Sequence, residues 1–252
     1  MQEKQPFLQT ILLKKDKIPS FSIYPFSLPV VRSLQSLSFH PKVTYIIGEN
    51  GTGKSTLLEA IATAWGFNPE GGTKNFRFST NSSHSSLYEY LTLVKGLQKP
   101  IDGFFLRAES FYNVASYIDE MDKDPFSGGK IIDSYGGTSL HEQSHGESFF
   151  SVFMNRFSSN GLYILDEPEA ALSPMRQLSM LIRMHELVDE GAQFIIATHS
   201  PILMGYPDAT MYSLHQEKIQ EITLEETEHY QTMKLFFEDR ERLFHHLFRP
   251  YP

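Results

Sequence analysis

The chain has 252 residues, of which 40% are hydrophobic and 21% charged, a composition typical of a globular protein with one large α/β domain or two small ones. Its formal net charge of -8 argues against nonspecific binding to nucleic acid, because an acidic surface repels phosphate backbones unless it carries a local basic patch. The lack of cysteine excludes disulfides and thiolate metal sites. No apolar run approaches the roughly 20 residues of a membrane span, and the N-terminus is polar, so we expect a cytoplasmic protein with no membrane segment of its own.

Short apolar runs alternate with helical patterns along the chain. In the first half we expect an edge strand over 8–13, a proline-containing loop over 18–29, a strand over 42–47, a helix over 56–65, a polar stretch over 68–86, a strand over 101–106 and a helix over 111–121. In the second half we expect a loop over 122–140, a helix over 144–157, a strand over 162–165, a helix over 174–188, a strand over 194–197 and a final helix over 227–248. This alternation predicts a parallel sheet covered by helices. We find no repeat and no linker, so we expect a single domain over residues 1–252.

A glycine-rich loop separates the strand over 42–47 from the helix over 56–65. Residues 48–56 read Gly-Glu-Asn-Gly-Thr-Gly-Lys-Ser-Thr and fit G-x-x-x-x-G-K-[ST], a loop whose backbone N–H groups and following helix can face phosphate oxygens. Lys54 supplies a mobile cation for the β- and γ-phosphates, and the hydroxyl of Ser55 can ligate Mg²⁺. The predicted phosphate-binding residues are Gly48, Asn50, Gly51, Thr52, Gly53, Lys54, Ser55 and Thr56. The alternative is a glycine-rich turn without a ligand.

Two adjacent carboxylates follow the predicted strand over 162–165. Residues 162–168 read Leu-Tyr-Ile-Leu-Asp-Glu-Pro, which delivers both acids to the carboxyl edge of the sheet, where α/β proteins bind ligands. Asp166 would hold Mg²⁺, directly or through water, and Glu167 would polarise the attacking water as a general base. The alternative is an acidic pair that caps the next helix, but the phosphate loop favours the catalytic interpretation.

These motifs resemble those of the ABC ATPase family, and the likeness extends over most of the chain. Residues 165–173 resemble the family's Walker B motif and D-loop, and Ala197-Thr198-His199-Ser200 resembles its switch-histidine motif. The chain is similar to free-standing AAA-family predicted ATPases, which resemble SMC, Rad50 and RecF heads without the coiled coil. The resemblance implies an α/β P-loop fold of the ABC head type, with a parallel core sheet flanked by helices, an antiparallel edge sheet and a small helical arm over about 111–160. It also implies ATP and Mg²⁺ as cofactors, with Lys54, Glu167 and His199 as catalytic residues and His199 contacting the γ-phosphate.

The ABC family also has a signature sequence, usually Leu-Ser-Gly-Gly-Gln, that binds the ATP of the opposite subunit. Two segments compete for this role: 126–130 is closer letter by letter, and 143–147 reads Gln-Ser-His-Gly-Glu. The signature opens a helix that precedes the Walker B strand, and only 143–147 is followed by an apolar helical stretch, a turn and that strand. We therefore expect Ser144, Gly146 and Glu147 to contact the partner's nucleotide, although His145 and Glu147 stand where glycine and glutamine are usual.

Two further positions of the family pattern stay open. Glu109 stands where the Q-loop glutamine is expected, and its carboxylate either orders Mg²⁺-bound water or is a solvated surface group. An aromatic ring that stacks on adenine is expected upstream of the phosphate loop, and Tyr24, Phe26 and Phe39 are all candidates.

The resemblance implies a homodimer that sandwiches two ATP molecules, hydrolyses them to ADP and phosphate, and acts as a switch or motor on an unidentified protein or nucleic-acid partner. Glu109 argues against the alternative of a transporter's nucleotide-binding subunit, because the Q-loop couples transporters to their membrane domains. About thirty residues separate Glu109 from Ser144, too few for a long coiled-coil arm, while a DNA-maintenance role of the SMC or RecF type stays open. The intact Asp166, Glu167 and His199 argue against a nucleotide sensor without turnover.

Overall fold

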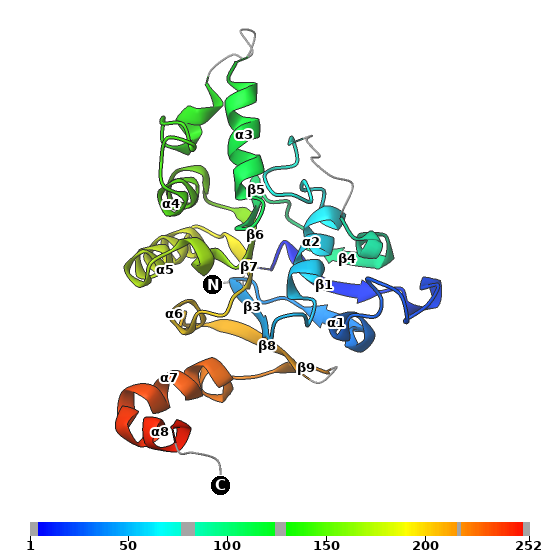
Figure 1. Cartoon of the computed structure of the whole chain (residues 1–252). Helices are drawn as coiled ribbons and strands as arrows, with labels where there is room; N and C mark the ends of the chain where they lie inside the picture. Colours follow the sequence, from blue (N-terminus) through cyan, green and yellow to red (C-terminus); the bar gives the residue numbers. More distant parts are fainter. Residues whose placement is uncertain (1–4, 77–83, 124–129, 216–217, 249–252) are drawn as a thin grey trace.

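A computed structural model describes residues 5–76, 84–123, 130–215 and 218–248, which contain two β-sheets (Figure 1). The larger sheet has six strands, in spatial order β5 (Asp102–Arg107), β6 (Gly161–Asp166), β7 (Gln193–Ala197), β3 (Val43–Gly48), β8 (Ala209–His215) and β9 (Lys218–Glu221). Its strands are parallel except β9, which pairs antiparallel with β8. The smaller sheet is antiparallel, in the order β2 (Ser36–Ser38), β1 (Leu8–Leu13) and β4 (Leu91–Lys95).

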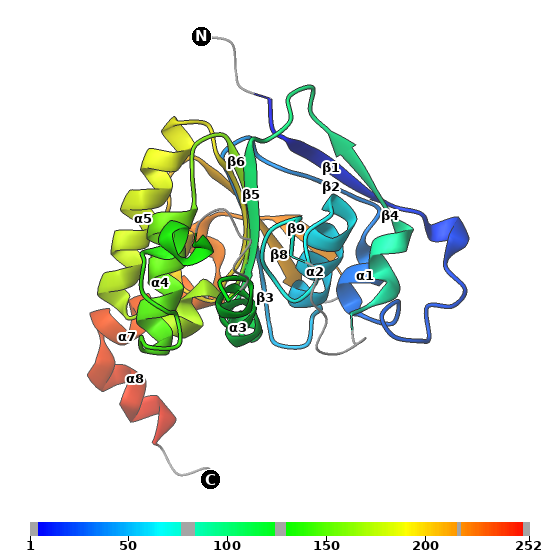
Figure 2. The same ribbon diagram turned by 90° about the horizontal axis from the view of Figure 1, so that it is seen from above.

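Helices cover both faces of the larger sheet (Figure 2). One face carries α2 (Lys54–Trp65), with α1 (Pro29–Ser33) and the smaller sheet beside it; the other carries α3 (Phe111–Met121), α4 (His145–Arg156) and α5 (Pro174–Asp189). The short helix α6 (Pro201–Met204) follows β7. Five short 3-10 helices lie in the connections: η1 (Lys15–Lys17), η2 (Ser86–Tyr90), η3 (Ile131–Tyr135), η4 (Pro168–Ala171) and η5 (Leu224–Glu226).

The central strands are buried and mostly apolar because both of their faces are covered. Successive side chains of β6 alternate between two hydrophobic clusters: Tyr163 and Leu165 pack with the cluster that includes α3, α4 and α5, and Leu162 and Ile164 pack with the cluster that includes α2. This two-sided burial fixes the strands rigidly, so the loops at their carboxyl ends are held in place.

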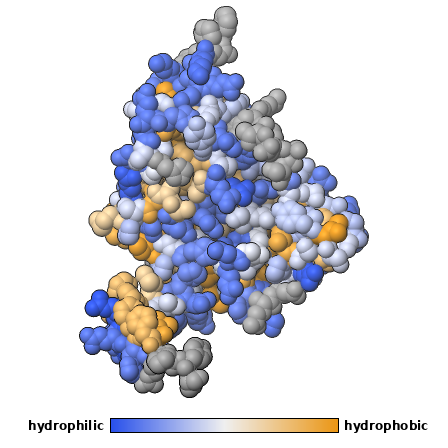
Figure 3. All heavy atoms as spheres, viewed as in Figure 1, coloured by the Kyte–Doolittle hydropathy of each residue, from blue (hydrophilic) through white to orange (hydrophobic). Residues whose placement is uncertain are grey.

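The last two helices extend away from the sheet (Figure 1). They are α7 (Glu228–Glu238) and α8 (Arg240–Leu247), and neither contains a buried residue. Large apolar side chains on them are exposed, among them Phe237 at 74% and Leu247 at 64%, and Figure 3 shows these hydrophobic atoms gathered at the end of the molecule.

The structure confirms the predicted α/β architecture, with its parallel core sheet and antiparallel second sheet. The strand predicted over 8–13 is confirmed as β1, but its predicted edge position was wrong, because β1 lies in the centre of the smaller sheet, between β2 and β4. The strands β2, β4, β8 and β9 and the short helices α1 and α6 were not predicted from the sequence.

The single final helix predicted over 227–248 was also wrong. Asp239 ends α7 with φ -148° and ψ 67°, and its carboxylate accepts a hydrogen bond of 3.0 Å from the backbone N–H of Arg242, which caps α8. A side chain that competes for backbone hydrogen bonds thus divides the helix in two. The single domain and the helical arm over about 111–160 stay predictions, and α3, η3 and α4 lie within that range. Within the described ranges, every helix is too short or too polar to span a bilayer.

Candidate functional site

The loop between β3 and α2 is held in a narrow turn by close packing at both of its ends. Gly53 precedes α2 with φ +98°, a left-handed conformation that favours glycine, and a Cβ there would lie 2.7 Å from Val30 Cγ1. A Cβ on Gly48 would lie 2.7 Å from the carbonyl oxygen of Leu214. The loop therefore presents its backbone at the N-terminus of α2, where the helix dipole favours negative charge.

The middle of the loop is more open. Asn50 and Gly51 form its exposed tip, and the hydroxyl of Thr52 donates a hydrogen bond of 2.9 Å to the carbonyl of Glu49. Thr56 is partly buried in the first turn of α2. The loop residues predicted to bind phosphate thus lie between the end of β3 and the start of α2, as the motif requires.

The side chain of Lys54 is folded over the phosphate loop and is only 4% exposed. Its Nζ donates hydrogen bonds to the carbonyl oxygens of Gly48 at 2.8 Å and Glu49 at 3.0 Å. Burial lowers the pKa of Lys54, and the carboxylates at the end of β6 oppose that shift. The ammonium group therefore lies beside the loop backbone and is attracted by the acidic edge of the sheet.

Ser55 and Asp166 meet although 111 residues separate them in the chain. The Ser55 hydroxyl donates a hydrogen bond of 3.1 Å to Asp166 Oδ1, and Asp166 is only 3% exposed at the end of β6. Burial raises the pKa of Asp166 to about 7, although Arg107 and Ser55 lower it. A hydroxyl and a buried carboxylate side by side are oxygen ligands of the kind that Mg²⁺ prefers, so both residues fit the predicted metal.

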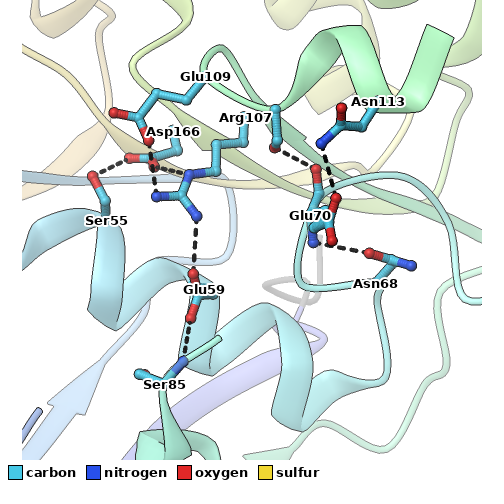
Figure 4. Close-up of polar contacts among 10 residues, drawn as sticks. Ser55, Glu59, Asn68, Glu70, Ser85, Arg107, Glu109, Asn113 and Asp166 are labelled. Carbon is cyan, nitrogen blue, oxygen red and sulfur yellow. Dashed lines mark hydrogen bonds and ion pairs between the residues drawn. The ribbon is translucent and has the colours of Figure 1, made fainter. Parts of the chain in front are cut away.

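One arginine connects the carboxylates around this site (Figure 4). Arg107 ends β5, and its Nε lies 3.4 Å from Asp166 Oδ2, while its terminal nitrogens donate to Glu59 at 2.9 Å and Glu109 at 3.1 Å. Glu59 also accepts a hydrogen bond of 2.9 Å from the backbone N–H of Ser85. Burial lowers the pKa of Arg107, but the three carboxylates outweigh it and the pKa is raised, so the guanidinium stays charged.

The predicted metal residue Glu109 lies at the edge of this network. Its side chain is 82% exposed, and with Ser55 and Asp166 it lines a small cavity of about 210 Å³. Its ion pair with Arg107 allows either of the roles that the sequence left open.

Glu167 follows Asp166 in an uncommon backbone conformation. Its φ is +50°, in the left-handed region that a glutamate rarely adopts, and its backbone N–H donates a hydrogen bond of 3.0 Å to the carbonyl of Ala197 at the end of β7. Its side chain is 38% exposed, and Oε1 lies 3.6 Å from His199 Nε2. Strain of this kind at an acidic strand end is typical of a residue held for function.

His199 contacts side chains from two other elements, η4 and α7. Its backbone N–H donates to the Glu169 carboxylate, and its Nδ1 lies 3.2 Å from Nε2 of His229 in α7. Burial lowers the pKa of His199; Lys54 acts in the same direction and Glu167 in the opposite one. A cleft of about 640 Å³ opens here, and its lining includes Glu49, Asn50, Glu167, His199 and His229.

The predicted signature residues lie at the N-terminus of α4. Ser144 caps this helix and forms a reciprocal capping box with Glu147, in which the Ser144 N–H donates to Glu147 Oε2 at 3.1 Å. A Cβ on Gly146 would lie 2.5 Å from the carbonyl oxygen of Ala171 in η4, so this contact requires glycine. Because α4 and α2 cover opposite faces of the sheet, the capping box lies apart from the phosphate loop of the same chain (Figure 2).

Part of the competing signature segment, 126–129, lies outside the described residues, as does the side chain of His145. After Lys130 the chain forms only the short η3, which Gly136 ends. Of the three aromatic candidates for adenine stacking, Phe26 and Phe39 are buried at 2% and 5% exposure, and Tyr24 is 62% exposed. Tyr24 is therefore the one of the three with a ring open to a ligand.

Sequence reasoning gave no role to Glu59, Arg107 or His229. Ser55 and Glu59 are four residues apart and so share a face of α2, a spacing that could have indicated Glu59. Arg107 reaches the site because β5 pairs with β6. His229 reaches it because the chain after β9 runs back to His199. Neither residue therefore belongs to a sequence motif that could have indicated its role.

Comparisons with known proteins agree with this geometry. Residues 21–134 match the family model described as "AAA domain", and residues 136–205 match one described as "AAA domain, putative AbiEii toxin, Type IV TA system". The cytochrome c biogenesis ATP-binding export protein CcmA of Legionella pneumophila (strain Paris) is 26% identical over 190 residues, 72% of this chain and 92% of CcmA. These matches support the resemblance of the chain to ABC-type P-loop ATPases.

Two solved structures are also similar to this chain. A nucleotide-free ATP-binding cassette from an ABC transporter aligns with 83% of the chain and 91% of its own length, at a TM-score of 0.49 and 17% identity. The SMC head domain from Thermotoga maritima aligns with 86% of the chain and 98% of its own length, at a TM-score of 0.44 and 16% identity.

Proposed function

We propose that this ABC-type chain hydrolyses ATP to ADP and phosphate at a site shared between two copies of itself. The observation that carries the proposal is the arrangement of Lys54, Ser55, Asp166, Glu167 and His199 at the carboxyl ends of β3, β6 and β7. These three strands are neighbours in the sheet, so a phosphate-binding loop, a metal-binding pair and a candidate base meet at one edge.

Each residue has a distinct role in the proposed site. The loop from Gly48 to Thr56 cradles the phosphates with its backbone N–H groups, and Lys54 turns its ammonium toward them. Ser55 and Asp166 hold Mg²⁺, which neutralises charge on the β- and γ-phosphate oxygens when it is bound. Glu109 orders water around that metal, and Arg107 holds the Glu109 carboxylate nearby.

Glu167 and His199 act on the attacking water and the terminal phosphate. Glu167 lines both the small cavity beside Asp166 and the larger cleft beside His199, so its carboxylate can accept the proton of a water positioned between them. His199 lines the same cleft, and its Nε2, which lies 3.6 Å from Glu167 Oε1, is the nitrogen that we expect to donate a hydrogen bond to a phosphate oxygen.

The dimer rests on the position of the signature residues. Ser144, Gly146 and Glu147 begin α4, which covers the face of the sheet opposite α2, and we expect them to contact the nucleotide of a second copy rather than that of their own chain. Dimerisation should then depend on ATP, because neither half of the site is complete alone.

The test uses purified chain and a Glu167→Gln variant. Because a positioned general base contributes about 10²- to 10⁴-fold to rate, we expect turnover to fall by at least about 100-fold while ATP binding persists and the dimer accumulates in size-exclusion chromatography with ATP. Glu190→Gln, at an exposed position after α5, is the matched control and should keep wild-type turnover. Full turnover in Glu167→Gln would refute the role of this residue, and failure of the wild-type chain to bind Mg–ATP in calorimetry would refute the function.

A second candidate function is that of the ATP-binding subunit of a membrane exporter. The observation that favours it is the match to 92% of CcmA, whose name describes an ATP-binding export protein. Co-purification of the tagged chain with an integral membrane protein, with ATPase activity raised by that protein, would support this candidate over a free-standing switch. Stimulation by DNA with a steep salt dependence would instead support a DNA-maintenance role.

A further inference from the structure

The contact between His199 and His229 joins the end of β7 to the first turn of α7. His199 Nδ1 and His229 Nε2 lie 3.2 Å apart, and the two ring centroids lie 5.3 Å apart with an angle of 57° between the ring planes. In a neutral imidazole one nitrogen donates a hydrogen bond and the other accepts one. Two neutral rings that meet through one nitrogen each must therefore divide these roles between them.

Burial and the nearby Lys54 lower the pKa of His199, so this ring is neutral near pH 7 and its single proton resides on one of its two nitrogens. The nitrogen that carries the proton decides what His199 can do at the proposed site. Only a proton on Nε2 lets the ring donate toward the cleft, because Nδ1 is directed at His229.

The Glu167 carboxylate distinguishes the two possible arrangements. If His199 donated from Nδ1, the lone pair of its Nε2 would face Glu167 Oε1 at 3.6 Å, so two acceptors would oppose each other. If His229 donates to Nδ1, the proton of His199 lies on Nε2 and faces the carboxylate favourably. His199 Nε2 is buried and makes no hydrogen bond within the described part of the chain, and the Glu167 carboxylate 3.6 Å away is the group that a proton on it would face.

His229 is held in place by the turn before α7. Thr227 is 2% exposed and caps the helix: its hydroxyl accepts a hydrogen bond of 3.1 Å from the Tyr230 N–H and donates one of 2.7 Å to the Leu224 carbonyl. Since α7 has no buried residue of its own, this cap sets where the helix begins and hence where His229 lies.

We propose that His229 is a positioning residue, which donates a hydrogen bond from Nε2 to His199 Nδ1 and thereby keeps the proton of His199 on the nitrogen that faces Glu167 and the cleft. The inference rests on the proposed function for its purpose, the donation of a hydrogen bond to a phosphate oxygen. Its chemical content, the tautomer of one ring, can be measured without turnover. His229 would thus fix the tautomer of His199 by a hydrogen bond, as a carboxylate or backbone carbonyl does for many metal-bound histidines.

The experiment reads the tautomer directly. Protein labelled with ¹⁵N-histidine, free of nucleotide, is examined at pH 7.5 by two-bond ¹H–¹⁵N correlation, with the His199 signals assigned by loss in a His199→Gln variant. We expect His199 to show the Nε2–H form alone in the wild-type chain. In His229→Phe, which keeps a ring but removes the donor, we expect the His199 signals to shift partway toward the Nδ1–H form, because Glu167 alone still favours Nε2–H. His229→Gln places an amide donor at a similar distance and should restore the wild-type pattern.

Turnover gives the second readout. We expect His229→Phe to lower kcat about fivefold to tenfold with KM unchanged, the effect of one lost neutral hydrogen bond, and His229→Gln to recover most of it. His246→Phe makes the same substitution in α8, away from the cleft, and is the matched control.

The two proposals fail in different ways. A chain that binds no Mg–ATP refutes the proposed function and leaves the tautomer measurement intact. An Nδ1–H form in the wild-type chain, or His199 signals that do not change in His229→Phe, refutes the role of His229 even if the chain is an active ATPase.

Discussion

Replacing Asp166 by asparagine keeps the shape of this side chain but removes a charge that is buried at the end of β6. Burial raises the pKa of Asp166 from its usual 3.8 to about 7 in the folded chain, even with Arg107 beside it. The folded state therefore binds this proton more tightly than the unfolded state does. The contribution of the Asp166 carboxyl to the free energy of unfolding is therefore full below pH 3.8 and is lost as the pH rises to about 7.

The size of the effect follows from the shift in pKa. At about 1.36 kcal/mol per unit, a shift of roughly three units corresponds to about 4 kcal/mol between the two pH limits. Most of the loss lies in an accessible range: from pH 5 to pH 8 the wild-type chain should lose roughly 2–3 kcal/mol on account of this one carboxyl. Because asparagine does not titrate, the free energy of unfolding of Asp166→Asn should rise by that amount relative to that of the wild-type chain between pH 5 and pH 8.

Urea unfolding between pH 5 and pH 8, with a chelator and no nucleotide, measures this difference. Asp133→Asn, at an exposed position in η3, is the matched control, and its difference from wild type should not change with pH in this way. A difference between Asp166→Asn and wild type that stays constant over the range would show that Asp166 does not carry a costly buried charge, and would refute the reasoning.

Two further predictions concern the surroundings of Asp166. Arg107→Met should cost about 3–5 kcal/mol in urea unfolding at pH 8, because it leaves the Glu59 and Asp166 carboxylates without their cation. Lys234→Met removes an exposed ion pair and should cost less than about 1 kcal/mol; equal costs for the two variants would contradict the burial of the arginine network. Gly53→Ala should weaken Mg–ATP binding more than Gly51→Ala in calorimetry, because both residues have positive φ but only Gly53 has a neighbour, Val30, at 2.7 Å. Equal binding by the two variants would mean that the loop relaxes around the added methyl group.

The sequence predicted the parts of the site that are local in the chain. The phosphate loop and the Asp166–Glu167 pair each follow a strand that is buried on both faces, and such strands appear as unbroken apolar runs. β8 and β9 were missed because they lie toward the edge of the sheet, where exposed polar residues interrupt the apolar pattern. Propensity alone likewise did not reveal that Asp239 caps a new helix.

The missed site residues depend on contacts that only the tertiary structure creates. Arg107 reaches Asp166 through the pairing of β5 with β6, and His229 reaches His199 across 30 residues of chain. A motif identifies residues by their neighbours in sequence, whereas these two residues are identified by neighbours in space. Ser144 was predicted as a signature residue because the helix and strand expected after it, rather than the closeness of the motif's sequence, decided between segments 126–130 and 143–147.

The contact between Glu59 and the Ser85 amide connects the proposed metal site to the start of the second sheet. Ser85 directly precedes η2, which leads into β4, and its amide hydrogen is bonded to the same carboxylate that holds Arg107. A ligand or substitution that moves the Arg107 guanidinium away from Glu59 would change the strength of the hydrogen bond between the Ser85 N–H and the Glu59 carboxylate. The exchange rate of the Ser85 amide hydrogen with heavy water would thus report on events at the acidic edge of the core sheet.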